Sequence, residues 1–117
     1  MKILNTEIEF DFNDADDMER FENELNIMGS KLKNIKSVGR KRSIVIREFC
    51  EAVINCLDKT FGEGTGKKVF GEKTNLVLCI KAFEDICIAR DNYDKMFEQQ
   101  IKTIESKYSP DVANRGK

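Results

Sequence analysis

Hydrophobic and acidic residues alternate between positions 7 and 12, as in a β-strand that buries one face. The apolar members of this alternation are Ile8, Phe10 and Phe12. An apolar pair at positions 3 and 4 and a turn at Asn5-Thr6 complete the pattern of a hairpin over residues 1–12. Because a two-stranded unit is marginal alone, we expect this hairpin to lie against helices or to pair with a strand of another copy.

A first helix is predicted after the hairpin, because apolar residues recur at alternating spacings of three and four. Asn13 or Asp14 offers an N-cap, and further acids follow where the helix dipole favours negative charge. Gly29 weakens the middle of this helix by roughly 1 kcal/mol relative to alanine, and Gly39 ends the unit. The apolar positions form a narrow stripe like a coiled-coil seam, made of Met18, Phe21, Leu25, Met28, Leu32 and Ile35.

A second helix is predicted from about Ser43 to Phe61, with an apolar face broad enough for the centre of a core. That face consists of Ile46, Phe49, Cys50, Val53, Ile54, Leu57 and Phe61. Residues 62–71 contain four glycines, which favours a loop that reverses the chain between two helices. We expect Val69 and Phe70 to pack this loop against the core.

A final long helix is predicted from a cap at Thr74 as far as Tyr108, where Ser109-Pro110 stops it. The apolar pattern opens with Leu76, Cys79, Ile80, Phe83, Ile86 and Cys87. It resumes as Tyr93, Phe97, Ile101, Ile104 and Tyr108. An unbroken helix of this length would span about 50 Å, whereas a compact domain of this size has a radius of gyration of about 13 Å. We therefore expect either a break near Asn92 with the second half folded back, or a second half that projects and buries its stripe on another subunit.

The stripe from Tyr93 to Tyr108 is the strongest candidate for a functional surface, because it exceeds what a compact core needs. If the helix folds back, these residues are ordinary core. If it projects, its amphipathic face fits a partner's groove or zips to its own copy. The sequence leaves both alternatives open.

Composition indicates one folded domain. In a chain of 117 residues, hydrophobic residues make up 40% and charged residues 35%. We predict a mainly α (α+β) domain over residues 1–110, with the N-terminal hairpin and three to four helices, and a flexible tail over residues 111–117. No apolar run approaches the roughly 20 residues that cross a bilayer, and the chain does not start with a signal-peptide pattern. We therefore expect a cytoplasmic protein that contacts no membrane.

The inventory of reactive side chains argues against an enzyme, a metal site or a bound cofactor. The chain has no histidine, the usual proton shuttle near neutral pH. Its four cysteines lie within apolar helical patterns without zinc-site spacing, so we interpret them as reduced core thiols. The glycine-rich stretch departs from a phosphate-binding loop, because Phe61 stands where the first glycine is required and Lys68 where Ser or Thr is required.

The net charge of −1 conceals a strong asymmetry along the chain. Residues 1–25 hold nine acids and two bases, whereas residues 29–47 hold seven bases and no acid. This favours either an intramolecular match between the two segments or head-to-tail contact between copies. The basic stretch could also contact an acidic protein or nucleic acid, although the absence of interleaved aromatics disfavours nucleic acid. The candidate electrostatic contacts are Lys31, Lys33, Lys36, Arg40, Lys41 and Arg42.

Residues 61–71 (FGEGTGKKVFG) and 73–84 (KTNLVLCIKAFE) resemble a family of short phage and prophage proteins of Gram-positive hosts. Residues 7–12 (EIEFDF) and 14–22 (DADDMERFE) resemble the start of the same family, so the likeness extends to about Ala89. Members look like tail assembly chaperones of long-tailed phages, which bind the tape-measure protein, keep it soluble and help the tail tube polymerise around it.

The resemblance implies a helical protein of the host cytoplasm that self-associates and binds the tape-measure or another phage tail protein. It supplies no catalytic or ligand residues. Two further functions remain open: a structural component of a phage tail or connector, and a nucleic-acid-binding regulator that uses the basic stretch.

Overall fold

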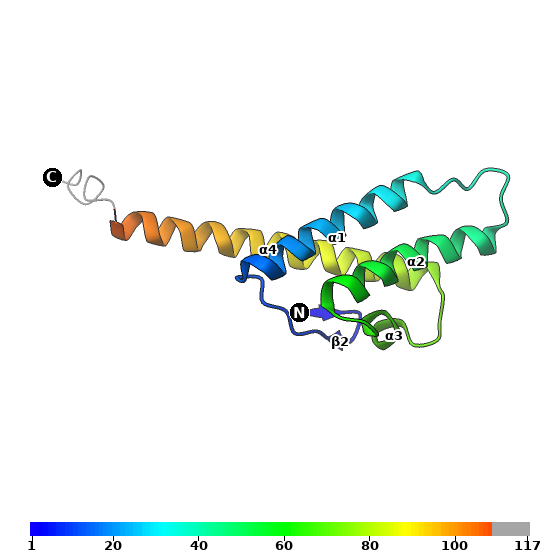
Figure 1. Cartoon of the computed structure of the whole chain (residues 1–117), viewed down its shortest axis with the longest axis horizontal. Coiled ribbons are helices and arrows are strands. Elements are labelled where there is room, and N and C mark those ends of the chain that lie inside the picture. The colour runs from blue at the N-terminus through cyan, green and yellow to red at the C-terminus, as the bar shows by residue number, and fades with distance from the viewer. Residues whose placement is uncertain (109–117) are drawn as a thin grey trace.

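The computed structural model describes residues 1–108, which form two short strands and four helices (Figure 1). The elements are β1 (Lys2–Ile3), β2 (Thr6–Glu7), α1 (Ala15–Asn34), α2 (Arg42–Phe61), α3 (Thr65–Phe70) and α4 (Leu76–Tyr108). The predicted mainly helical fold, with an N-terminal hairpin and a long last helix, is confirmed. The predicted stop at positions 109–110 and the predicted tail over residues 111–117 lie outside the described residues.

The hairpin is shorter than its alternating pattern predicts. Lys2 pairs with Glu7 and Ile3 with Thr6, so the turn lies one residue earlier than expected. Residues 8–12 lie outside the strands, although the Ile8 N–H still donates a 2.8 Å hydrogen bond to the Met1 carbonyl across the hairpin. The hairpin packs against α4, and the Leu4 N–H donates a 2.8 Å hydrogen bond to the Asp85 carboxylate.

α1 begins where the acidic residues predict and stays helical through Gly29. The Asp14 side chain caps it by accepting a 2.9 Å hydrogen bond from the Asp17 N–H. Its apolar stripe packs on α2 and fully buries Phe21 and Met28. The two helices run antiparallel side by side and are joined by the loop of residues 35–41 (Figure 1).

α2 is the central helix, because α1, α3 and α4 all pack against it. The predicted loop over residues 62–71 is wrong in one respect, since its middle forms the short helix α3. Gly64 precedes α3 with a φ of 91°, a left-handed conformation that glycine adopts without strain. Phe70 is buried and Val69 is half-buried against the core, as predicted.

α4 is a single helix of 33 residues that runs through Asn92 without a break, so the folded-back alternative is wrong. Its first turn is capped by Asn75, whose side chain accepts from the Leu78 N–H, and not by Thr74. The second half projects beyond the other helices (Figure 1). The molecule is therefore elongated, with extents of 69 × 29 × 21 Å and a radius of gyration of 18.8 Å against about 13 Å for a compact domain.

Candidate protein-interaction surface

One apolar stripe runs along the whole of α4, and only its first half is covered. Cys79, Ala82 and Ile86 are buried against the rest of the domain. At 100° per residue, Tyr93 and the predicted residues that follow it continue the same face of the helix. The covered part ends at Tyr93, whose ring stacks on Phe12 with centroids 3.8 Å apart and an interplanar angle of 10°.

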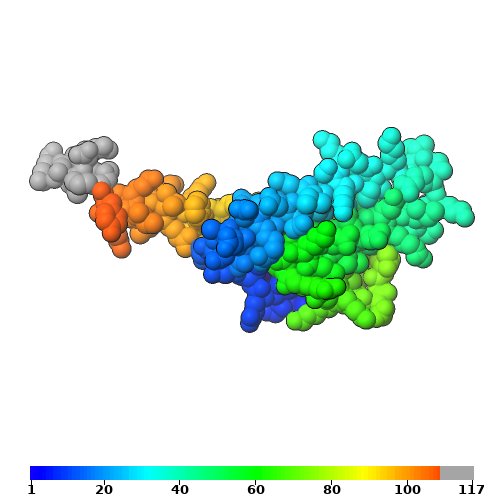
Figure 2. All heavy atoms as spheres, in the orientation of Figure 1, coloured from blue at the N-terminus to red at the C-terminus, as the bar shows by residue number. Residues whose placement is uncertain are grey.

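Beyond Tyr93 the stripe is exposed. Phe97 is 60% exposed, Ile104 is 54% exposed and Tyr108 is 82% exposed, while Ile101 is 38% exposed. In the space-filling view this part of α4 is a narrow rod that extends from the body of the molecule (Figure 2). We call these four residues the distal stripe. The structure thus keeps the five predicted residues on one helix face and separates Tyr93, which belongs to the core edge, from the other four.

A groove of about 860 Å³ lies between the start of α1 and the second half of α4. Its apolar walls come from both sides and consist of Phe12, Ala15, Met18, Tyr93, Phe97, Ile101 and Ile104. Its charged lining residues are all acids, namely Asp14, Glu22 and Asp94. We call this the acidic groove. The sequence pattern did not reveal it, because its two walls are about 80 positions apart in the chain.

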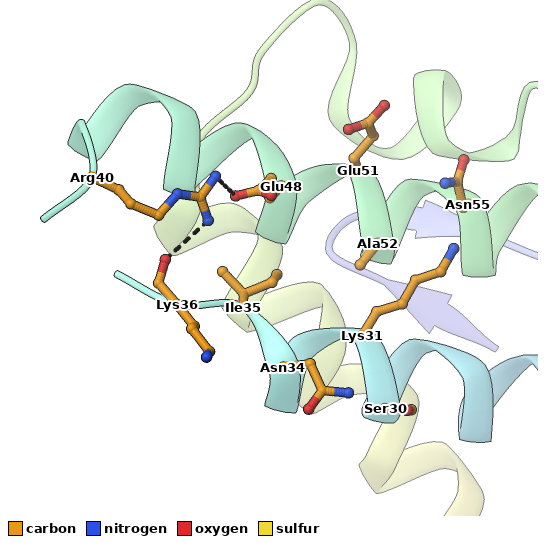
Figure 3. A pocket seen from close by; sticks show the side chains of 10 residues that line it. All are labelled: Ser30, Lys31, Asn34, Ile35, Lys36, Arg40, Glu48, Glu51, Ala52 and Asn55. Carbon is orange, nitrogen blue, oxygen red and sulfur yellow. Dashed lines mark hydrogen bonds and ion pairs between the residues drawn. The ribbon is translucent and has the colours of Figure 1, made fainter. Parts of the chain in front are cut away.

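The basic stretch lies at the other end of the molecule, around the end of α1, the 35–41 loop and the start of α2 (Figure 1). A second hollow of about 580 Å³ lies here, and of the six predicted basic residues it brings together Lys31, Lys36 and Arg40 (Figure 3). Arg40 donates to the Lys36 carbonyl at 3.0 Å and forms an ion pair with Glu48.

Two carboxylates stand among the bases of this hollow. Glu48 and Glu51 line it together with the lysines and Arg40 (Figure 3). Lys33, Lys41 and Arg42 are exposed nearby but do not line it. The two carboxylates oppose the attraction of phosphates that Lys and Arg supply, so this mixed charge favours a protein contact over a nucleic-acid backbone.

The acidic and basic segments do not neutralise each other within one copy. Among residues 1–108, no ion pair joins an acid of segment 1–25 to a base of segment 29–47. The two segments meet on α1, where Glu24 and Lys31 line the same small hollow without forming an ion pair. Of the two alternatives left by the sequence, the intramolecular match is therefore not realised as ion pairs in the described part of the chain.

The cysteine thiols are protected by burial. Burial raises the pKa of Cys56 to about 11, and burial followed by a hydrogen bond with Cys50 raises the pKa of Cys79 to about 12. Burial also raises the pKa of Cys87. These thiols are therefore protonated at neutral pH, and all four cysteines are free.

Two features are absent from the part of the chain that the structure describes. No group of three or more His, Cys, Asp or Glu residues there is placed to hold a metal ion. None of its helices combines the length and apolarity that crossing a membrane requires.

In a comparison with family profiles, residues 4–117 match a family described as "Family of unknown function (DUF6673)". Comparison with curated proteins and with solved structures gives no match.

Proposed function

The chain belongs to the DUF6673 family of unknown function, and we propose that it is a binding protein that holds a helix of a client during assembly of a larger structure. The contact surface is the distal stripe together with the acidic groove. The observation that carries this proposal is the exposure of Phe97, Ile104 and Tyr108 on a helix that projects from the core.

The distal stripe has the chemistry of a helix-binding face. Moving one large apolar side chain from water into a buried contact is favourable by about 1.5–3 kcal/mol of free energy. A partner that covers the distal stripe gains this free energy for several side chains at once. The opposite side of the same helix carries charged residues, which keep the uncovered helix in solution. These residues are Lys95, Glu98, Lys102 and Glu105. An amphipathic helix of this kind binds a second apolar helix along its length.

The client we propose is a phage tape-measure protein, which makes this chain a phage tail assembly chaperone acting in the host cytoplasm. Two arguments support this choice. The sequence of residues 7–22 and 61–84 resembles such chaperones, and a tape-measure protein is a long helical chain that needs its apolar stripes covered before the tail forms. A structural tail or connector protein would use the same surface, but it would remain in finished particles, where mass spectrometry detects it.

Co-expression with the neighbouring tape-measure gene tests the proposal. We expect the wild-type chain to solubilise and co-purify the client, because its distal stripe covers apolar client surface. The double variant Phe97→Ser/Ile104→Ser should lose the client. The matched control is Ile88→Ser, since Ile88 is 58% exposed on the opposite side of α4. A wild-type chain that neither solubilises nor retains the tape-measure protein contradicts the chaperone function.

A further inference from the structure

We propose that copies of this chain associate head to tail, with the basic end of one copy seated on the acidic groove of the next. The basic end is defined here as Lys33, Lys36, Val38, Lys41 and Arg42, all exposed around the 35–41 loop. The proposal builds on the proposed function, because it names a second copy as a partner of the same groove, but it needs no client.

Charge complementarity supports the second copy as occupant. Every charged residue that lines the acidic groove is an acid, whereas segment 29–47 holds seven bases and no acid. Among residues 1–108, Arg40 is the one base of that segment that pairs with a carboxylate. The two surfaces lie toward opposite ends of an elongated molecule (Figure 1), so they can meet only between copies.

The basic end also offers an apolar group that the groove can cover. Val38 is 93% exposed on the loop between α1 and α2, and Lys36 and Arg40 flank it in the chain. Ile44 adds a second apolar side chain, 45% exposed, at the start of α2. An apolar side chain flanked by bases matches a groove with apolar walls and an acidic rim.

The start of α2 carries bases at a cost to the helix. Lys41 is its N-cap residue and Arg42 its first residue, its first turn has no acid, and no side chain caps it. Positive charge is unfavourable at a helix N-terminus, where the dipole favours acids. α1 follows the favourable pattern, with Asp16 and Asp17 in its first turn. A contact with the carboxylates of a neighbouring copy accounts for bases in a place where they destabilise the isolated helix.

Because the contact joins two different surfaces, two copies bound in this way still leave one surface of each kind unoccupied. Each added copy leaves one free groove and one free basic end, so association continues into a filament or closes as a ring. The mean assembly size should therefore rise with protein concentration and fall with salt, because the matched charges are screened.

A charge swap tests the contact. The groove variant is Glu22→Lys/Asp94→Lys, and the end variant is Lys36→Glu/Lys41→Glu; none of these four side chains forms an ion pair or a hydrogen bond among residues 1–108. Like charges then face each other in each variant alone, and we expect sedimentation velocity to show association weakened more than about tenfold. An equimolar mixture should restore assembly, because each variant's altered surface matches a surface of the other.

The control for the net charge of the groove variant is Glu63→Lys/Glu84→Lys, which adds the same positive charge at exposed positions outside both surfaces and should associate like the wild type. A wild-type chain that stays monomeric at low salt overturns the head-to-tail contact, as does a mixture that fails to restore it. If the swaps have no effect while Phe97→Ser/Ile104→Ser abolishes association, the copies pair through their distal stripes and the head-to-tail contact is wrong. Client co-purification is scored separately, so either proposal can fail alone.

Discussion

Gly66 allows α3 to lie directly against α2. A Cβ atom at this position would stand 2.6 Å from Cγ2 of Ile54, closer than side chains tolerate. The Gly66 N–H donates a 2.7 Å hydrogen bond to the Asp58 carboxylate, which fixes the approach. The sequence pattern indicated only that the glycines of residues 62–71 interrupt a helix. It could not show that one of them makes close packing possible, because the contact partner lies in the preceding helix.

We predict that Gly66→Ala lowers the free energy of unfolding by about 1–3 kcal/mol, the usual cost of forcing extra volume into a packed interior. Urea unfolding of the wild type and the variant measures this loss of free energy. Ile54→Ala removes the clashing methyl group, so in that background the added penalty of Gly66→Ala should shrink.

Gly29 provides the matched control for this substitution. It lies within α1 and has no atom within 4 Å of an added Cβ. Gly29→Ala should therefore raise stability by up to about 1 kcal/mol, because alanine favours helix more than glycine does. Equal effects of the two substitutions would mean that Gly66 acts through backbone freedom alone and not through its contact with α2.

Among the elements, α4 shows what periodicity can and cannot predict. Its apolar spacing predicted both the helix and the face that Tyr93 and Phe97 share. It did not decide whether the helix breaks at Asn92, because asparagine and aspartate lower helix propensity by only a few tenths of a kcal/mol. That small preference does not outweigh continuous backbone hydrogen bonding, so α4 stays unbroken. Cap positions were also predicted to within one residue, since Asn75 replaces Thr74.

The start of α2 should become more stable when its bases are replaced by acids. Lys41→Glu or Arg42→Glu removes positive charge from the helix N-terminus and adds negative charge there, and we expect a gain of about 0.3–1 kcal/mol at low salt. Thermal and urea unfolding of dilute, monomeric protein measure this gain. Under the head-to-tail proposal, the same variants associate more weakly although they fold more stably.

The matching control lies at the other end of the same helix. Lys59 is in the last turn of α2, where positive charge is favourable. Lys59→Glu should therefore lower stability by a similar amount. If all three substitutions shift stability in the same direction, the helix dipole does not explain the effect, and the bases at the start of α2 carry no stability cost.

For the whole molecule, the sequence showed the charge asymmetry and the apolar stripe of the last helix, but it left open whether that stripe is exposed and did not show the acidic groove. Both walls of the groove were visible as separate patterns, the acids at the start of α1 and the apolar positions of α4. Their juxtaposition depends on Phe12 stacking on Tyr93, a contact between residues 81 positions apart. Local spacing carries no information about such a contact. The groove therefore belongs to the part of the site that only the tertiary structure provides.

Amide hydrogen exchange should divide α4 into two halves. Residues 79–90 pack on the core and should be strongly protected. Residues 96–108 lack such packing, and an isolated helix of this length is marginal, so their amides should exchange far faster in dilute protein.

Raising the protein concentration should slow exchange around the acidic groove and at residues 36–42 together, because one head-to-tail contact covers both. Adding the client should slow exchange at residues 96–108. Equal protection of both halves of α4 in dilute protein would mean that a single copy covers the distal stripe, and the helix-holding function would lose its surface.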